Sequence, residues 1–84
     1  MDADAKRELR QFLKAALTSR GDEEDFADDD SLFVSARLDS LAMMNLIMYL
    51  EKTVGLDFSR AEFDVEFIDS VNEIEAFLDS QGGT

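Results

Sequence analysis

The segment Leu38-Asp39-Ser40-Leu41 holds the side chain best suited to chemistry, a serine hydroxyl between an acid and the start of an apolar helical pattern. The chain contains no His and no Cys, so it has no imidazole base, no thiol nucleophile and no soft metal ligand of its own. A nucleophilic serine also needs a base within hydrogen-bond reach and a preorganised oxyanion site. Lys52 lies about three helical turns from Ser40. We therefore expect no catalytic residues, and we interpret Ser40 as a hydroxyl that another enzyme modifies.

Ser40 lies at the start of a predicted helix that runs to about Val54. Sorting its residues at about 100° per position places one apolar stripe toward the core. This stripe consists of Met43, Leu46, Ile47, Leu50 and Val54. Leu41, Met44 and Met48 lie nearly opposite, so a second apolar face points away from the core. Either other elements cover this second face, or it is an exposed docking ridge in which Met adapts to several partners.

An apolar stripe at helical spacing predicts a first helix that ends near Gly21, because Gly adopts a left-handed cap without strain. The stripe consists of Leu9, Phe12, Leu13, Ala16 and Leu17. The acidic run 22–30 is aperiodic, which predicts a long loop through about Arg37 that Leu32 and Phe33 attach to the core. We expect its charges to form a solvated face. Its calcium-loop frames lack the Gly required at the sixth position, so no metal site is predicted.

The Ser-x-x-Glu pattern of a capping box occurs at residues 59–62 and 70–73. The first predicts a short helical segment through Phe63, Val65 and Phe67. The second predicts a final helix, whose apolar face consists of Val71, Ile74, Phe77 and Leu78.

Ser70 competes with Ser40 as a modified residue, because it also follows an acid and precedes an aliphatic residue. Its capping partner Glu73 already gives Ser70 a structural role. We therefore place Ser40 ahead of Ser70. The plain structural alternative at the first site is that Asp39 or Ser40 serves only as a helix N-cap.

These elements predict an all-α fold, with three main helices in a bundle, a short extra helix before the last, and a long loop between the first two. The 84 residues form a single domain, residues 1–84, that buries only about 60–65% of its unfolded surface, so no deep, dry cleft is expected. The polar residues 80–84 are expected to form a flexible tail. The predicted core consists of Leu9, Phe12, Leu13, Leu17, Leu46, Ile47, Leu50, Val54, Ile74, Phe77 and Leu78.

The charge balance limits the partners, because 20 acidic residues against 8 basic ones give a formal net charge of -12. Such a charge repels nucleic acids and anionic membrane surfaces and favours partners with basic patches. The absence of Cys excludes disulfides, and the acidic N-terminus predicts no secretory signal. We expect a cytoplasmic monomer that binds neither nucleic acid nor membrane.

Residues 31–41, together with the order of helical signals over 32–78, resemble the acyl carrier and peptidyl carrier proteins. In that family the serine of Asp-Ser-Leu carries a 4'-phosphopantetheine arm, a role that the resemblance gives to Ser40. It implies a small acyl-carrier-like helical bundle. It also implies a phosphopantetheinyl transferase that takes the arm from coenzyme A, a loading ligase or acyltransferase, and downstream enzymes as partners.

The partners of carrier proteins contact the helix that follows the modified serine. The resemblance therefore implies docking through Leu41, Met44 and Met48, with Asp39 as a charge-assisted contact to a basic partner.

Two positions after the serine distinguish this chain from typical fatty-acid carriers, which have acids where Ala42 and Asn45 stand. Many members also have Gly in place of Ala36. The missing acids predict a specialised, stand-alone acyl or aminoacyl carrier with dedicated partners. The alternative from another class is a small acidic interaction module that has the carrier fold and is never pantetheinylated.

Overall fold

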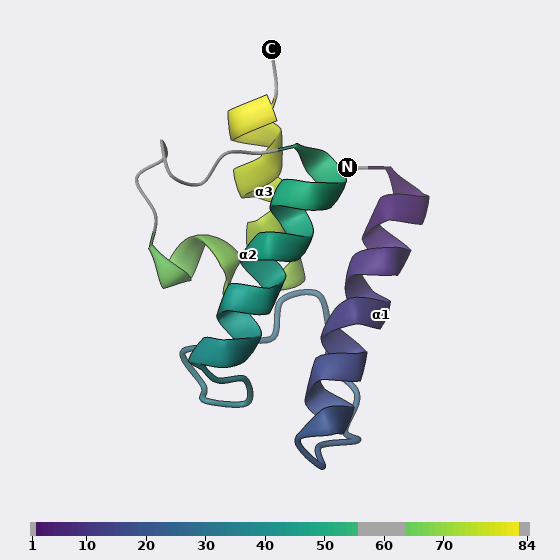
Figure 1. Cartoon of the computed structure of the whole chain (residues 1–84), viewed down its shortest axis with the longest axis vertical. Helices are drawn as coiled ribbons and strands as arrows, with labels where there is room; N and C mark the ends of the chain where they lie inside the picture. Colours follow the sequence, from purple (N-terminus) through teal and green to yellow (C-terminus); the bar gives the residue numbers. More distant parts are fainter. Residues whose placement is uncertain (1, 56–63, 83–84) are drawn as a thin grey trace.

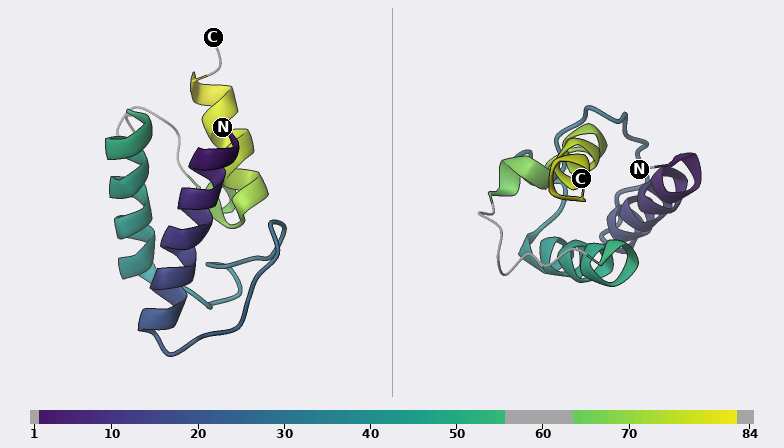
Figure 2. Two further views of the ribbon diagram at one scale, coloured as in Figure 1. Left: turned by 90° about the vertical axis from the view of Figure 1, so that its right-hand side faces the viewer. Right: turned by 90° about the horizontal axis from the view of Figure 1, so that it is seen from above.

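The computed structural model describes residues 2–55 and 64–82 of the 84-residue chain. Within these residues it contains three α-helices, one short 3₁₀ helix and no strand. The elements are α1 (Ala3–Ser19), α2 (Ser40–Val54), the 3₁₀ helix η2 (Val65–Ile68) and α3 (Val71–Gly82). Helices α1 and α2 lie side by side and run in opposite directions (Figure 1), and α3 packs beside both (Figure 2). The predicted all-α bundle with a short helix before the last is confirmed.

Helix α1 begins and ends with side-chain and backbone caps. The carboxylate of Asp2 accepts a hydrogen bond from the N–H of Ala5 at 2.7 Å. At the other end Gly21 has a φ of 84°, and the N–H of Asp22 donates to the carbonyl of Leu17 at 3.0 Å. The positive φ of Gly21 turns the chain so that the N–H groups after the helix bond its last carbonyls, as the sequence predicted.

Helix α2 has the predicted bounds. Asp39 is its N-cap, and Gly55, with a φ of 74°, ends it by donating its N–H to the carbonyl of Glu51 at 3.0 Å. Leu46 and Leu50 are fully buried, which confirms the predicted core stripe for these two residues. The side chain of Val54 lies outside the described residues.

The start of α3 contains the predicted capping box. The hydroxyl of Ser70 accepts from the N–H of Glu73 and donates to its carboxylate, both at 3.1 Å. The other predicted box, 59–62, lies outside the described residues, as does Phe63. Asp64 caps η2 by accepting from the N–H of Glu66 at 3.1 Å. Because α3 extends to Gly82, the predicted tail includes part of a helix, and its flexibility stays a prediction.

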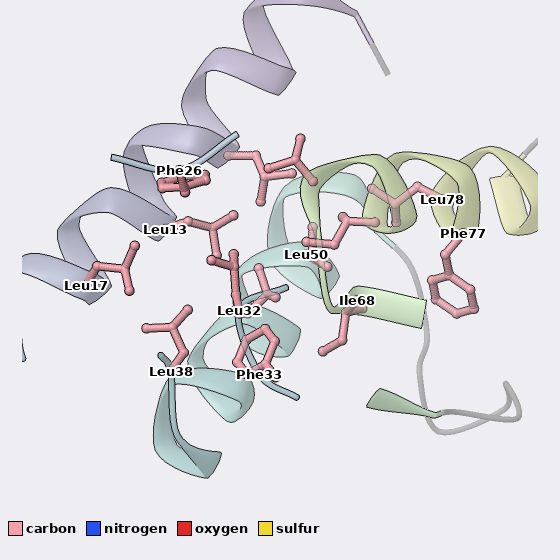
Figure 3. Packing of buried hydrophobic residues seen from close by; sticks show 14 residues of the cluster. Leu13, Leu17, Phe26, Leu32, Phe33, Leu38, Leu50, Ile68, Phe77 and Leu78 are labelled. Carbon is pink, nitrogen blue, oxygen red and sulfur yellow. The ribbon is translucent and has the colours of Figure 1, made fainter. Parts of the chain in front are cut away.

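A single hydrophobic core joins all the elements (Figure 3). Its buried members are Leu9, Leu13, Leu17, Phe26, Leu32, Phe33, Leu38, Leu46, Leu50, Ile68, Val71, Ile74, Phe77 and Leu78. Phe12 and Ile47, predicted as core, are only partly buried and pack against its edge. Leu32 and Phe33 attach the loop to the core as predicted. Phe26 and Leu38, which the sequence analysis did not place there, contribute two more side chains from the same loop.

Asp69, at the corner between η2 and α3, fixes the middle of the long loop. One oxygen of its carboxylate accepts from the N–H groups of Phe33 at 2.7 Å and Val34 at 2.8 Å. Its backbone carbonyl accepts from the N–H of Leu32 at 2.8 Å. The loop backbone is therefore bonded to a residue that is distant in sequence and itself buried.

Basic side chains hold the acidic part of the loop. Arg37 pairs with Asp22 at 3.1 Å, and Lys6 pairs with Asp28 at 3.1 Å. Arg10 bonds both Asp28 and the carbonyl of Phe26, and its guanidinium lies 4.5 Å from the centre of the Phe26 ring. The expectation of a simple solvated face was wrong for Asp22 and Asp28. Both are half-buried because cations of the same chain accompany them.

Candidate functional site

Ser40 is exposed and is the first residue of α2. The capping role belongs to the preceding residue, because Asp39 accepts from the N–H of Ala42 at 2.9 Å. Within the described residues, the hydroxyl of Ser40 has no hydrogen-bond partner. The N-cap of α2 is therefore Asp39, and the Ser40 hydroxyl makes no hydrogen bond that stabilises the described part of the fold.

Asp39 uses both carboxylate oxygens inside its own chain. While one caps α2, the other lies 2.6 Å from the guanidinium of Arg20, the residue that ends α1. The N–H of Ala42, aided by the charge of Arg20, lowers the pKa of Asp39, so the carboxyl is ionised at neutral pH. The ion pair joins the end of α1 to the start of α2 immediately beside Ser40. The role of Arg20 was not predicted, because a lone basic residue after a helix carries no signal in the sequence.

Ser70, the competing serine, is only 2% exposed. Its hydroxyl is occupied by Glu73 on both the donor and the acceptor side. An enzyme that modifies a serine needs an accessible hydroxyl. Ser40 has an accessible hydroxyl, and Ser70 does not.

Three apolar side chains of α2 face solvent next to Ser40. Leu41 is 67% exposed, Met44 61% and Met48 62%. The predicted orientation of this second face is correct, and among the described residues no other element covers it. Val34 in the loop and Phe67 in η2 are further exposed apolar residues, and their exposure was not predicted from the sequence.

An open groove with a volume of about 1050 Å³ lies between α1 and α2, and Asp39 and Leu41, the neighbours of Ser40, line it. Phe12 and Tyr49 also line it and stack on each other, with ring centroids 4.5 Å apart and planes at 21°, so they join the two helices. Burial, with the charge of Glu8, raises the pKa of Tyr49, so its hydroxyl is neutral at physiological pH. This groove was missed because it requires the pairing of α1 with α2, which helical periodicity alone does not give.

The position of Ser40 suits an attached phosphate. The first N–H groups of a helix and its dipole favour negative charge at the N-terminus. Arg20, which pairs with Asp39, places a guanidinium next to the same helix start. Both features favour a negatively charged group at this end of α2.

A comparison with protein families finds that residues 7–78 match the phosphopantetheine attachment site family. The match covers most of the chain, which therefore belongs to this family, and the resemblance found in the sequence is confirmed. The family's prosthetic group is covalently bound 4'-phosphopantetheine, on which these carrier domains hold acyl groups. Such domains are generally not catalytic; they interact with phosphopantetheinyl transferases and biosynthetic enzymes. Searches of curated proteins and of solved structures gave no match.

Two further properties of the part of the chain that the structure describes concern membranes and metal ions. None of its helices combines the length and the apolar character needed to cross a membrane. In the same part, no group of acidic residues is arranged to hold a metal ion.

Proposed function

We propose that Ser40 carries the 4'-phosphopantetheine arm and that the protein is a specialised acyl or aminoacyl carrier with dedicated partner enzymes. The observation that carries this proposal is the exposed hydroxyl of Ser40, which the fold does not use and which lies within the matched residues 7–78. Ser70 is the poorer candidate because it is buried and bonded to Glu73.

The chain contributes a nucleophile and a docking surface to its own modification. The hydroxyl oxygen of Ser40 forms a bond to the phosphorus of coenzyme A nearest the pantetheine. The bond from that phosphorus to the oxygen leading to 3',5'-ADP breaks, and 3',5'-ADP leaves. The hydroxyl proton goes to a base of the transferase, since this chain has no His to accept it. The N-terminus of α2 then stabilises the phosphodiester electrostatically. Once attached, the arm supplies a terminal thiol that holds the cargo as a thioester.

The exposed face of α2 is the proposed docking ridge for the transferase, the loading enzyme and the enzymes that follow. Leu41, Met44 and Met48 supply apolar area that solvent covers in the free protein. Asp39 is proposed as a contact for a basic partner, which would compete with Arg20 for its carboxylate. Exchange of one exposed ion pair for another costs little free energy, since such pairs contribute about 0–1 kcal/mol.

The test of the proposed attachment site is the intact mass after incubation with coenzyme A, magnesium and a broad-range phosphopantetheinyl transferase. The parent protein and a Ser35→Ala control should each gain one phosphopantetheine group, whereas Ser40→Ala should gain none while its circular dichroism stays unchanged. Ser35 is an exposed serine of the neighbouring loop, so it controls for nonspecific modification. A mass gain on Ser40→Ala contradicts the proposal. No gain on the parent with several transferases favours the unmodified interaction module, for which Met44 and Met48 are the residues to test.

Specialisation is proposed because the positions after the serine lack charge. Asn45 is exposed on α2 near the ridge, and Gln11 is exposed on α1. Asn45→Asp should raise the rate at which general fatty-acid enzymes accept the protein, because it adds negative charge where their basic patches dock. Gln11→Glu adds the same charge elsewhere and should have a smaller effect. A parent protein that supports fatty-acid elongation as well as a general carrier contradicts the proposed specialisation.

A further inference from the structure

The groove between α1 and α2 has one end at the proposed attachment residue. Asp39 and Leu41, the two neighbours of Ser40 in sequence, both line it. From there it follows α2 to Glu51 and Lys52. Figures 1 and 2 show the two helices side by side along this length. A flexible group attached to Ser40 therefore starts at the entrance of the groove.

The length of the groove matches the length of the arm. From Asp39 to Lys52 the groove extends for about 20 Å, at 1.5 Å per helical residue. The arm has a backbone of about 14 bonds, which at roughly 3.5 Å per three bonds extends for about 16 Å. An extended arm that starts at Ser40 therefore ends within the groove, near Met48 and Lys52.

The lining of the groove suits an arm with methyl groups, a hydroxyl and two amides. Its apolar part includes Phe12, Ala16, Leu41, Ala42, Met48 and Tyr49. Among the polar side chains of the same lining, Asn45 can donate hydrogen bonds to amide carbonyls, and Ser19, whose hydroxyl donates to the carbonyl of Ala16, can accept one from an amide N–H. The surface is thus mainly apolar with a few hydrogen-bonding groups, a composition typical of sites for small organic groups.

Arg20 supplies the charge complementarity at the entrance. Its guanidinium lines the groove and pairs with Asp39 at 2.6 Å. A phosphodiester on Ser40 places a second anion beside this cation. Arg20 has further N–H donors with which to bond that anion while it keeps Asp39.

We propose that the groove between α1 and α2 is the resting site of the arm, with the phosphate at Arg20 and the thiol end near Met48 and Tyr49. This inference rests on the proposed function. Because the arm is tethered, its effective concentration at the groove is in the millimolar range, so weak contacts are sufficient to occupy it. The arm then leaves the groove whenever a partner enzyme binds it more tightly.

The decisive experiment uses protein whose arm carries ¹³C-labelled methylene groups next to the thiol, after intact mass has confirmed that the arm is attached. We expect nuclear Overhauser effects from these methylenes to the ring of Tyr49 and to Met48. Amide shifts between the forms with and without the arm should extend along α2 to Met48. Contacts to Phe67 or Met44 instead, or shifts confined to residues 39–42, would overturn the inference. Failure of the proposed function is distinguishable, because it appears as the absence of any mass gain.

Two pairs of variants test the groove and the charge separately. Ala15 is an exposed groove residue of α1, so Ala15→Trp should abolish the Overhauser effects to Tyr49, whereas Thr18→Trp adds the same ring outside the lining and should keep them. Arg20→Gln should weaken the effects and alter the ³¹P shift of the phosphodiester. Arg7→Gln removes an equal charge that pairs only with Asp4 in the described part of the chain, and it should change neither. Identical spectra for the members of each pair would overturn the inference.

Discussion

The acidic loop and the exposed face of α2 contrast in composition and in location. The loop, residues 20–39, is rich in acids, yet it supplies Phe26, Leu32, Phe33 and Leu38 to the core. Helix α2 is the most apolar segment, yet Leu41, Met44 and Met48 are each more than 60% exposed. Composition thus does not predict which side chains of either region are buried.

The difference lies in what fixes each backbone. In α2 the helical period decides which side chains face the core, and the apolar residues outside that stripe stay in water. In the loop no period exists, and its backbone is held by bonds to Asp69 and Arg10 outside the loop and by a bond from Arg37 of the loop itself to the carbonyl of Glu24. A regular element sorts its own side chains, whereas an irregular one depends on distant partners.

Replacing one leucine in each region gives the largest expected contrast. Leu32 is fully buried, so Leu32→Ala should lower the free energy of unfolding by about 2–5 kcal/mol through lost burial and a cavity. Leu41 is exposed, so Leu41→Ala removes little buried area and should change the free energy of unfolding by less than about 0.5 kcal/mol. Urea denaturation of both variants measures the difference. A loss below about 0.5 kcal/mol for Leu32→Ala as well would show that the acidic loop does not stabilise the core.

Removing the carboxylate of Asp69 tests the anchor of the loop. Asp69→Ala leaves the N–H groups of Phe33 and Val34 without their acceptor, which should cost about 3 kcal/mol if each contributes about 1–2. Asp29→Ala is the matched control, because Asp29 is exposed and makes no hydrogen bond within the described residues. The midpoint of thermal unfolding should fall only for Asp69→Ala. A normal midpoint for that variant would mean that the core alone holds the loop.

Lowering the pH should release the loop gradually, because it protonates the carboxylates of Asp69, Asp22 and Asp28. Burial on its own would raise the pKa of Asp69, but hydrogen bonds from Ser31 and from the N–H groups of Val34 and Phe33 outweigh it and lower the pKa. Hydrogen bonds from Arg37 and Lys6 lower the pKa of Asp22 and Asp28 respectively.

Because these pKa values are lower in the folded than in the unfolded chain, the folded protein binds fewer protons. Their stabilisation is therefore complete above the unfolded value of about 3.9 and is lost as the pH falls through the folded values. Urea midpoints measured down to about pH 2 should fall along this range. Asp69→Asn should flatten part of the decline, and an unchanged slope would argue against a role for Asp69 in it.

The smallest predicted effect concerns one loop residue. Ala36 has a φ of 66°, a left-handed conformation that costs an L-residue about 1 kcal/mol. Ala36→Gly should therefore raise the free energy of unfolding by up to about 1 kcal/mol. Gly55→Ala is the reciprocal control, since Gly55 has a φ of 74° and open space around it. It should destabilise by a similar amount, and equilibrium unfolding curves of the two variants should move in opposite directions.

The sequence by itself determined the regular elements and the proposed attachment residue. Helical period and caps gave the bounds of α2, the end of α1 at Gly21 and the capping box at Ser70. These features depend on contacts within a few residues, which a sequence displays directly. The motif around Ser40 is local in the same sense. Its role as the attachment residue stays a proposal.

Only the tertiary structure decided how distant segments meet. The hydrogen bonds of Asp69 connect residues about 35 positions apart, and the ion pair of Arg20 with Asp39 connects positions 19 apart. The groove lies between α1 and α2, where Phe12 stacks on Tyr49. No local pattern encodes such pairings, because they arise from the packing of whole helices around a shared core. The physical reason is the separation in sequence between the residues in contact. Bonds between residues a few positions apart determine the helices, whereas burial and pairing between distant residues determine how the helices are arranged.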